Sequence, residues 1–169
     1  MIRVQREDFS VGAEIDRLCA GGSAVGGVAV FIGLVRDVND DRAVQAMILE
    51  HYPGMTEREL DRLEQEARRR WPLQEVLIIH RFGRLVPSDR IVLVAATSAH
   101  RDAAFDACRF LIDWLKTRAP FWKQEETGQG RQWVVARESD ADAAARWSPI
   151  APGGAGADSR PSVAQAPRR

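Results

Sequence analysis

Apolar residues along this chain follow two kinds of pattern, one typical of β-strands and one typical of α-helices. Short runs that are apolar, or that alternate with polar positions, predict strands. These runs span 2–5, 25–33, 44–52, 75–83 and 90–98. Two further runs, 121–126 and 131–137, flank a glycine-containing turn and predict a closing hairpin. The glycines within 25–33 indicate close approach of another backbone segment.

Helical periodicity fills the intervals between these strands. Ser10 is a suitable cap for a first helix, which ends at Gly21-Gly22 and places one apolar stripe on Val11, Ile15, Leu18 and Cys19. For a second helix, Thr56 to Glu59 has the pattern of a capping box, with Met55 as a staple onto Leu60. Trp71-Pro72 ends this helix.

A third, longer helix is predicted over 99–118, with Ser98 as its cap and Pro120 just beyond its end. A short last helix is predicted over 139–147. The resulting order, β-α-β-β-α-β-β-α-β-β-α, is typical of an α+β fold rather than of regular βαβ winding. Several strands are short and apolar on both sides, so we expect a homodimer that covers a sheet edge.

The chain length suits one domain, which we expect over 1–147. Residues 148–169 hold four of the eight prolines and almost no large apolar side chain, which predicts a disordered tail. No apolar run has the length of a signal peptide or a membrane span, and the two cysteines lack metal-ligand spacing. We therefore expect a cytoplasmic protein without a metal site, in which Cys108 is a buried free thiol.

The charge balance of the chain argues against a nucleic-acid-binding protein. The formal net charge is zero, with 24 acidic and 24 basic side chains, and nucleic-acid binders normally carry a basic excess. Among those basic side chains, lysine occurs only at 116 and 123, on either side of Ala-Pro-Phe-Trp. Arginine does not lose its proton at workable pH, whereas a lysine near another cation can do so. If Pro120 turns the chain so that Lys123 faces Lys116, the pair can supply a nucleophile or a base.

Two simpler interpretations of the lysines stay open. Lys116 would then only stabilise the dipole at the end of its helix, and Lys123 would only protect an edge strand. Similar alternatives apply to other candidates. His100 and Arg101 lie at a helix start, where cations oppose the dipole, and this favours a bound anion or else simple exposure. Arg36 follows an apolar strand, as functional loop residues often do, but it also resembles a surface arginine beside acidic neighbours.

The length of the predicted third helix bears on whether these candidates can share one site. His100 and Lys116 are 16 residues apart on the same helix, which is about 24 Å at ~1.5 Å per residue. A small metabolite does not span that distance. The two ends therefore belong to separate sites, or a dimer brings the start of one helix to the end of its partner's; we favour the dimer.

Six separated blocks of sequence also resemble one known family, the large, catalytic subunit of molybdopterin synthase. The resemblance covers residues 1–147. The blocks are FIGLVRD (31–37), LEHYPGMTE (49–57), HRFGRL (80–85), SAHRDAAFDACRFLIDWLK (98–116), APFWKQE (119–125) and WVVARESD (133–140).

The resemblance implies an enzyme of molybdenum cofactor biosynthesis with an α/β hammerhead fold and an added antiparallel β subdomain. It implies a homodimer that binds two small ubiquitin-like subunits, each ending in a Gly-Gly thiocarboxylate. Two sulfurs would pass from these to cyclic pyranopterin monophosphate, forming the dithiolene of molybdopterin. No cofactor or metal is implied for this subunit.

The resemblance also implies roles for individual residues. Lys116 and Lys123 match the two essential lysines, one acting as a base or polarising the acyl group and the other stabilising negative charge; the pattern leaves open which does which. His100 and Arg101 match a phosphate-binding pair supplied by the opposite subunit. The remaining matches to substrate-contacting positions are Phe31, Leu34, Val35, Arg36, Gln124, Glu125 and Arg137. Many relatives have a basic residue where this chain has Gln124.

Two other function classes are compatible with parts of the pattern. A dimeric adaptor could dock a ubiquitin-like partner without chemistry, which would leave the paired lysines unexplained. A phosphate-metabolite enzyme could instead use a Schiff-base lysine, which borohydride trapping with a carbonyl substrate would detect.

Overall fold

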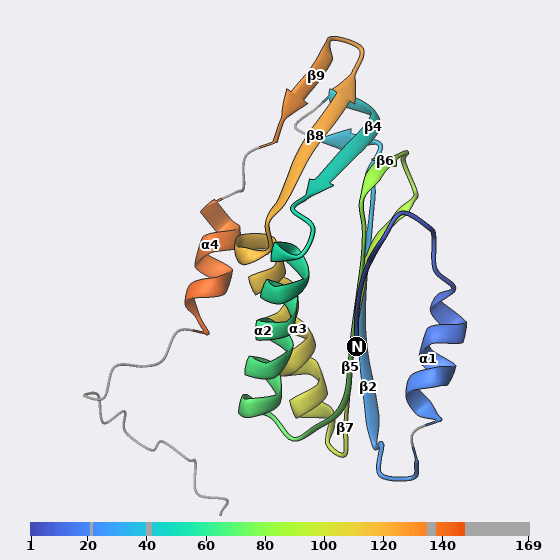
Figure 1. Ribbon diagram of the computed structural model, residues 1–169, viewed down its shortest axis with the longest axis vertical. Coiled ribbons are helices and arrows are strands. Elements are labelled where there is room, and N and C mark those ends of the chain that lie inside the picture. The colour runs from blue at the N-terminus through green and yellow to red at the C-terminus, as the bar shows by residue number, and fades with distance from the viewer. Residues whose placement is uncertain (21, 40–41, 135–137, 148–169) are drawn as a thin grey trace, which may run out of the picture.

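The computed structural model of the chain describes residues 1–20, 22–39, 42–134 and 138–147. Within these residues the fold is mixed α+β, with two sheets and four helices (Figure 1). The expected fold class is therefore confirmed at this level. The predicted tail, 148–169, lies outside the described residues.

The first sheet has four strands in the order β1-β5-β7-β2. β1 pairs with β5 in parallel, and the other two pairings are antiparallel. The strands are β1 (Ile2–Gln5), β5 (Leu73–Arg81), β7 (Arg90–Ser98) and β2 (Gly27–Leu34). β2 therefore forms one edge of this sheet.

Helices cover both faces of the first sheet (Figure 1). α2 (Met55–Arg70) and α3 (Arg101–Arg118) lie on one face, and α1 (Val11–Cys19) lies on the other. The period-two pattern of the strands explains this arrangement. In β5, Val76 and Ile78 join the core beneath α2 and α3, whereas Leu77 and Ile79 join the core beneath α1. α4 (Glu138–Ala145) packs beside α3.

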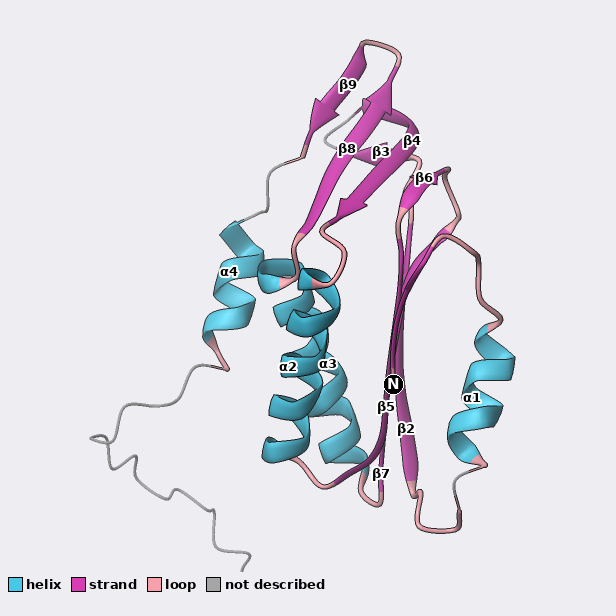
Figure 2. Cartoon of the chain, in the orientation of Figure 1, coloured by secondary structure: helices cyan, strands magenta, loops and turns pink. Residues whose placement is uncertain are grey.

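The second sheet extends past the ends of α2 and α3, as Figure 2 shows. Its central strand is β4, which pairs on one side with β8 and on the other with β6 and β3 along different parts of its length. The strands are β3 (Val38–Asn39), β4 (Arg42–His51), β6 (Gly83–Leu85), β8 (Phe121–Thr127) and β9 (Gly130–Trp133). A small apolar cluster of Val35, Met47, Leu49 and Leu85 anchors this sheet to the first.

Most predicted strands agree with the structure within two or three residues. The predicted run 75–83 is divided, because β5 ends at Arg81 and β6 begins at Gly83, whose φ of 95° favours glycine. The predicted close backbone approach is confirmed at Gly26, where an added Cβ would lie 2.1 Å from the Ala99 carbonyl oxygen. The end of the predicted strand 131–137 falls partly on residues outside the described ones.

The predicted start of the second helix was wrong. Gly54 is the N-cap, with a φ of 79°, and its N–H donates to the Glu57 carboxylate at 2.6 Å. Thr56 is fully buried inside the helix, where its hydroxyl donates to the carbonyl oxygen of Tyr52. The staple was wrong too, because Met55 is the first helical residue and is half exposed.

The predicted cap of the third helix was also wrong. Ser98 is the last residue of β7, and its hydroxyl donates to the Pro72 carbonyl oxygen at 2.9 Å. His100 is the N-cap, and its side chain makes no capping hydrogen bond. By contrast, Ser10 caps α1 as predicted, accepting from the Ala13 N–H at 3.4 Å.

The two cysteines are both free but differ in environment. Cys108 is buried as expected, and burial raises the pKa of its thiol to about 11. Cys19 is exposed, so its predicted place in the apolar stripe of α1 was wrong.

Candidate active site

A cavity of about 710 Å³ lies where the second sheet meets the end of α3 and the edge of the first sheet. Its apolar walls come from β2, β4, β7 and α3. Polar side chains from three distant parts of the chain converge on it: Arg36, Asn39, His80, Lys116, Lys123 and Glu125. This volume is in the range of small-molecule sites.

Both lysines of the chain line this cavity, as the sequence predicted. Lys116 lies in the last turn of α3, and Pro120 separates this helix from β8, which carries Lys123. Because side chains alternate across a strand, Lys123 and Glu125 face the cavity together. Gln124 lies between them, is not among the residues that line the cavity, and pairs in register with Ile48 and Trp133.

Each lysine has a carboxylate partner. The Lys123 ammonium lies 2.8 Å from Glu125 Oε1, and the Lys116 ammonium lies 3.4 Å from Asp140 Oδ1 on α4. Lys116 is the more exposed of the two, with 56% of its side chain accessible against 29% for Lys123. The predicted influence of one lysine on the proton affinity of the other stays a prediction.

A hydrogen-bonded group of three side chains forms one wall of the cavity. Arg36 donates to Asn39 Oδ1 at 2.9 Å, and Asn39 Nδ2 donates to both oxygens of Glu125 at 3.1 and 3.0 Å. Burial would raise the pKa of Glu125, but the hydrogen bonds from Lys123 and Asn39 and the charges of Lys123 and Arg36 outweigh it and lower that pKa. Glu125 is therefore an anion that anchors cations at this wall.

Two polar residues of the cavity wall were not selected from the sequence. His80 stacks on Phe121 with ring centroids 3.7 Å apart, and both line the cavity. Burial lowers the pKa of His80 to about 4, so the ring is neutral near pH 7. Asn39 is the other one. A lone histidine in an apolar strand, as in the run EVLIIHRFG, was the available signal for His80; Asn39 offered none.

The other residues that the family resemblance marked as substrate-contacting do not all line the cavity. Phe31 and Leu34 line the cavity and are also partly exposed at the β2 edge. Val35 is instead 3% exposed in the cluster with Met47 and Leu85, and its side chain does not line the cavity. Arg137 lies outside the described residues.

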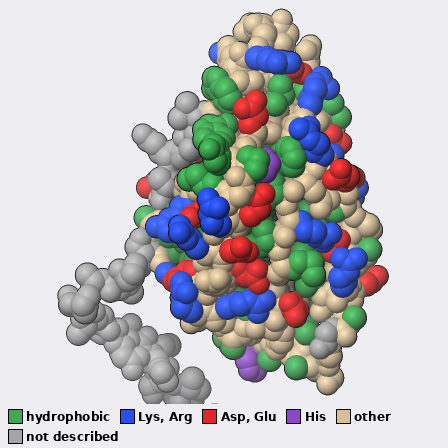
Figure 3. Space-filling model, in the orientation of Figure 1, with side chains coloured by type: hydrophobic (Ala, Val, Ile, Leu, Met, Phe, Trp, Pro, Cys, Tyr) green, Lys and Arg blue, Asp and Glu red, His purple; other side chains and the backbone are tan. Residues whose placement is uncertain are grey.

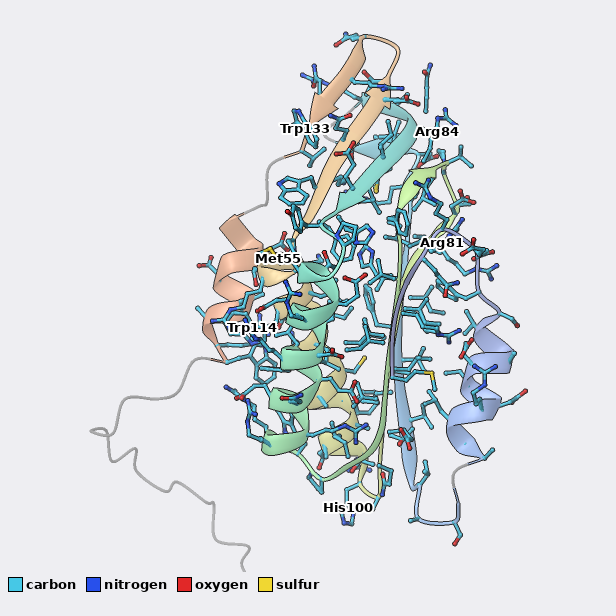
Figure 4. All side chains as sticks on the ribbon, viewed as in Figure 1. Met55, Arg81, Arg84, His100, Trp114 and Trp133 are labelled. Atoms are coloured by element: carbon cyan, nitrogen blue, oxygen red, sulfur yellow. The ribbon has the colours of Figure 1, made fainter. Side chains whose placement is uncertain are left out.

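His100 and Arg101 do not join this cavity within one chain. Figure 4 shows His100 at the end of the molecule opposite Trp133 and the second sheet. Arg101 is 84% exposed, and its nearest carboxylate is Asp102 at 3.4 Å. The separation inferred from helix length is thus confirmed, and the anion site at His100 and Arg101 stays a prediction.

Charges on the molecular face in Figure 3 are interspersed, with Lys and Arg beside Asp and Glu and no single basic region. Among the described residues, no three metal-binding side chains gather into a cluster. None of the described helices is long and apolar enough to cross a membrane.

Comparison with known proteins places the chain in a family. Residues 4–118 match the family described as MoaE protein. The chain belongs to the MoaE protein family. Over 146 residues it is 56% identical to the molybdopterin synthase catalytic subunit of Ralstonia nicotianae, covering 86% of this chain and 83% of the relative. It is 55% identical to the catalytic subunit of Pseudomonas aeruginosa, covering 86% and 97%.

A solved MoaE structure has the same fold. The molybdopterin biosynthesis MoaE protein from Burkholderia ambifaria superposes with a TM-score of 0.75 at 51% identity, covering 87% of this chain and 97% of that one. The family match ends at Arg118, before β8. The relatives extend the likeness over about 146 residues.

Proposed function

We propose how the cavity of this MoaE-family chain carries out its reaction. The chain is the catalytic subunit of a molybdopterin synthase, an enzyme that transfers sulfur in molybdenum cofactor biosynthesis, in accord with its relatives above 50% identity. One observation supports the assignment of the site: the only two lysines of the chain, which come from different elements, line one cavity.

The charges of the cavity suit two anionic reactants. The lining has three basic side chains, Arg36, Lys116 and Lys123, against one carboxylate, Glu125, so basic groups are in excess. The proposed reactants are cyclic pyranopterin monophosphate, which carries a phosphate, and the C-terminal thiocarboxylate of a small ubiquitin-like subunit. The relatives' name, catalytic subunit, is consistent with a second subunit in the enzyme.

In the proposed reaction, the thiocarboxylate sulfur forms a bond to a side-chain carbon of the pterin, which loses an oxygen substituent there. Water then cleaves the acyl–sulfur bond, so the sulfur stays on the pterin and the small subunit leaves with a C-terminal carboxylate. Arg36 holds the phosphate and orients the pterin beside the lysines. Lys116, the more exposed lysine, meets the incoming acyl group as a base or by polarising it. Lys123 stabilises the negative charge that develops, because its ammonium is fixed by Glu125 at the cavity wall.

The proposed assembly is a homodimer of α/β hammerhead chains, each with the second sheet as its added subdomain. β2 supports this proposal, because it is an edge strand on which four large apolar residues are 38–51% exposed: Val30, Phe31, Ile32 and Leu34. Such an edge favours cover by another chain. His100 and Arg101 would then reach the phosphate in the partner's cavity.

Subunit complementation tests this shared site. We expect Arg101→Ala and Lys116→Ala homodimers each to be inactive, because each lacks one part of every site. In a mixed dimer, one of the two sites regains both residues, so about half of the activity per wild-type dimer should return. Mixed dimers that stay inactive would show that His100 and Arg101 do not act across the interface.

Reconstitution tests the function as a whole. The protein, a thiocarboxylated small subunit and cyclic pyranopterin monophosphate are mixed, and the dithiolene-derived pterin is detected by fluorescence after oxidation. We expect product that requires all three components. A stable complex with the small subunit but no product would instead identify a docking protein, the adaptor class considered from the sequence.

A further inference from the structure

Asn39 is a buried polar residue of the cavity wall that touches two proposed substrate-binding residues. Its side chain lies between Arg36 on one side and Glu125 on the other, and Asn39 itself is 8% exposed. It belongs to β3, whereas Glu125 lies 86 positions later on β8. The amide thus connects the strand that follows the Arg36 loop to the strand that carries Lys123.

The chemistry of an amide explains why this position suits asparagine. An amide has an acceptor at one end and donors at the other. Its oxygen accepts from the Arg36 guanidinium while its nitrogen donates to the Glu125 carboxylate, so one group satisfies a cation and an anion together. An ionised aspartate could not donate to Glu125, and an alanine would leave both charged groups short of a partner in a buried place.

We propose that Asn39 is a positioning residue for sulfur transfer, which holds Arg36 and the Glu125–Lys123 ion pair in a fixed relation at the cavity wall. The inference rests on the function proposed above. Because arginine has five N–H donors, the bond to Asn39 orients the guanidinium and still lets it hold an anionic substrate group. Glu125, oriented by the same amide, in turn fixes the Lys123 ammonium at 2.8 Å.

The test compares Asn39→Asp and Asn39→Ala with the wild type in the reconstituted reaction, over a range of pH. Small errors in the placement of reacting groups are costly, so we expect kcat to fall roughly 10- to 100-fold in both variants. Asn39→Asp also places a second carboxylate beside Glu125, which already faces Arg36 and Lys123. The acid limb of its pH profile should therefore move to higher pH, because one of two adjacent carboxylates holds a proton more strongly.

Gln132→Ala is the matched control. Gln132 accepts a hydrogen bond from Arg42 at 2.6 Å, so it also links β4 to the hairpin of β8 and β9, but it is exposed and outside the cavity. This variant should have wild-type kcat and an unchanged pH profile.

The possible results distinguish a failure of the proposed function from a failure of the positioning role of Asn39. A wild-type protein that makes no product contradicts the proposed function itself. If the wild type is active, unchanged kcat and pH profiles in the Asn39 variants overturn the positioning role. A loss of activity that only follows a lower unfolding temperature, with no shift of the Asn39→Asp profile, also overturns it and assigns Asn39 a structural role. Aspartate has the same shape as asparagine, so Asn39→Asp alone can be used for the test if Asn39→Ala does not fold.

Discussion

Replacing Lys123 by alanine is expected to lower turnover by about 100- to 1,000-fold while the small subunit still binds. The substitution removes the ammonium that stabilises negative charge at the cavity wall, and loss of one such preorganised group costs about this much in other enzymes. It also leaves Glu125 without its ion-pair partner, 2.8 Å away, so the wall becomes more negative where anionic reactants must bind. Lys116→Ala should have an effect of similar size. The measurement is the rate of product formation in single-turnover reconstitution.

Arginine substitutions separate the two roles that a lysine can have. Lys→Arg keeps the positive charge but removes the amine that can lose its proton. A lysine that only stabilises charge should keep part of its activity as arginine, whereas a lysine that transfers a proton should not. Arg84→Ala is the matched control, because Arg84 pairs with the adjacent Glu126 at 2.9 Å outside the cavity. Wild-type turnover in both Lys116→Ala and Lys123→Ala would contradict the assigned site.

Acidification from pH 7 to pH 5 is expected to cost about 2 kcal/mol of stability through His80 alone. Burial lowers the pKa of His80 from 6.5 to about 4 in the folded protein. Between these values the unfolded chain binds a proton that the folded protein does not, so the free energy of unfolding falls as pH falls. This stability is fully present above about pH 6.5 and is lost progressively towards pH 4.

The carboxylates contribute mainly below this window. Hydrogen bonds and nearby Arg or Lys side chains lower the pKa of Glu66, Glu125 and Glu126 from 4.5. The stability that these carboxylates provide is therefore lost chiefly when the pH falls below that value. A comparison between pH 7 and pH 5 therefore reports largely on His80.

Urea unfolding of wild type and His80→Phe at both pH values measures this effect. Phenylalanine keeps an aromatic ring against Phe121, so the variant should fold but show about 2 kcal/mol less loss on acidification. His100→Phe removes an exposed histidine instead and should retain the wild-type loss. An equal loss in wild type and His80→Phe would show that the stacked ring is not kept neutral.

Much of the secondary structure could be predicted because its causes are local. Apolar runs identified the strands except the two-residue β3 and the division between β5 and β6, and the three-to-four-residue spacing identified α1 to α3 without knowledge of their neighbours. The errors occurred where a long-range contact competes with a local motif. Thr56 has the side chain of an N-cap but is buried with its hydroxyl bonded to Tyr52, and Ser98 bonds to Pro72 instead of capping α3. In both cases packing in the core outweighed a capping preference of about 1 kcal/mol.

The two cavity lysines could be selected from the sequence because lysine is unusual for this chain, which otherwise uses arginine. Helix length alone also placed His100 and Lys116 too far apart for one small ligand. Asn39 and His80 could not be found in this way. Asn39 reaches Glu125 across 86 positions, and His80 meets Phe121 only because β5 and β8 approach the same cavity.

The sequence by itself therefore determined most of the segments that form strands and helices, and it singled out the two scarce lysines as candidates for the chemistry. The tertiary structure decided which polar groups share the cavity wall and which carboxylate pairs with each lysine. The physical reason is the distance along the chain between the interacting residues. Periodicity and capping depend on neighbours within a few residues, whereas a hydrogen bond across the cavity depends on strand register and on how the two sheets meet.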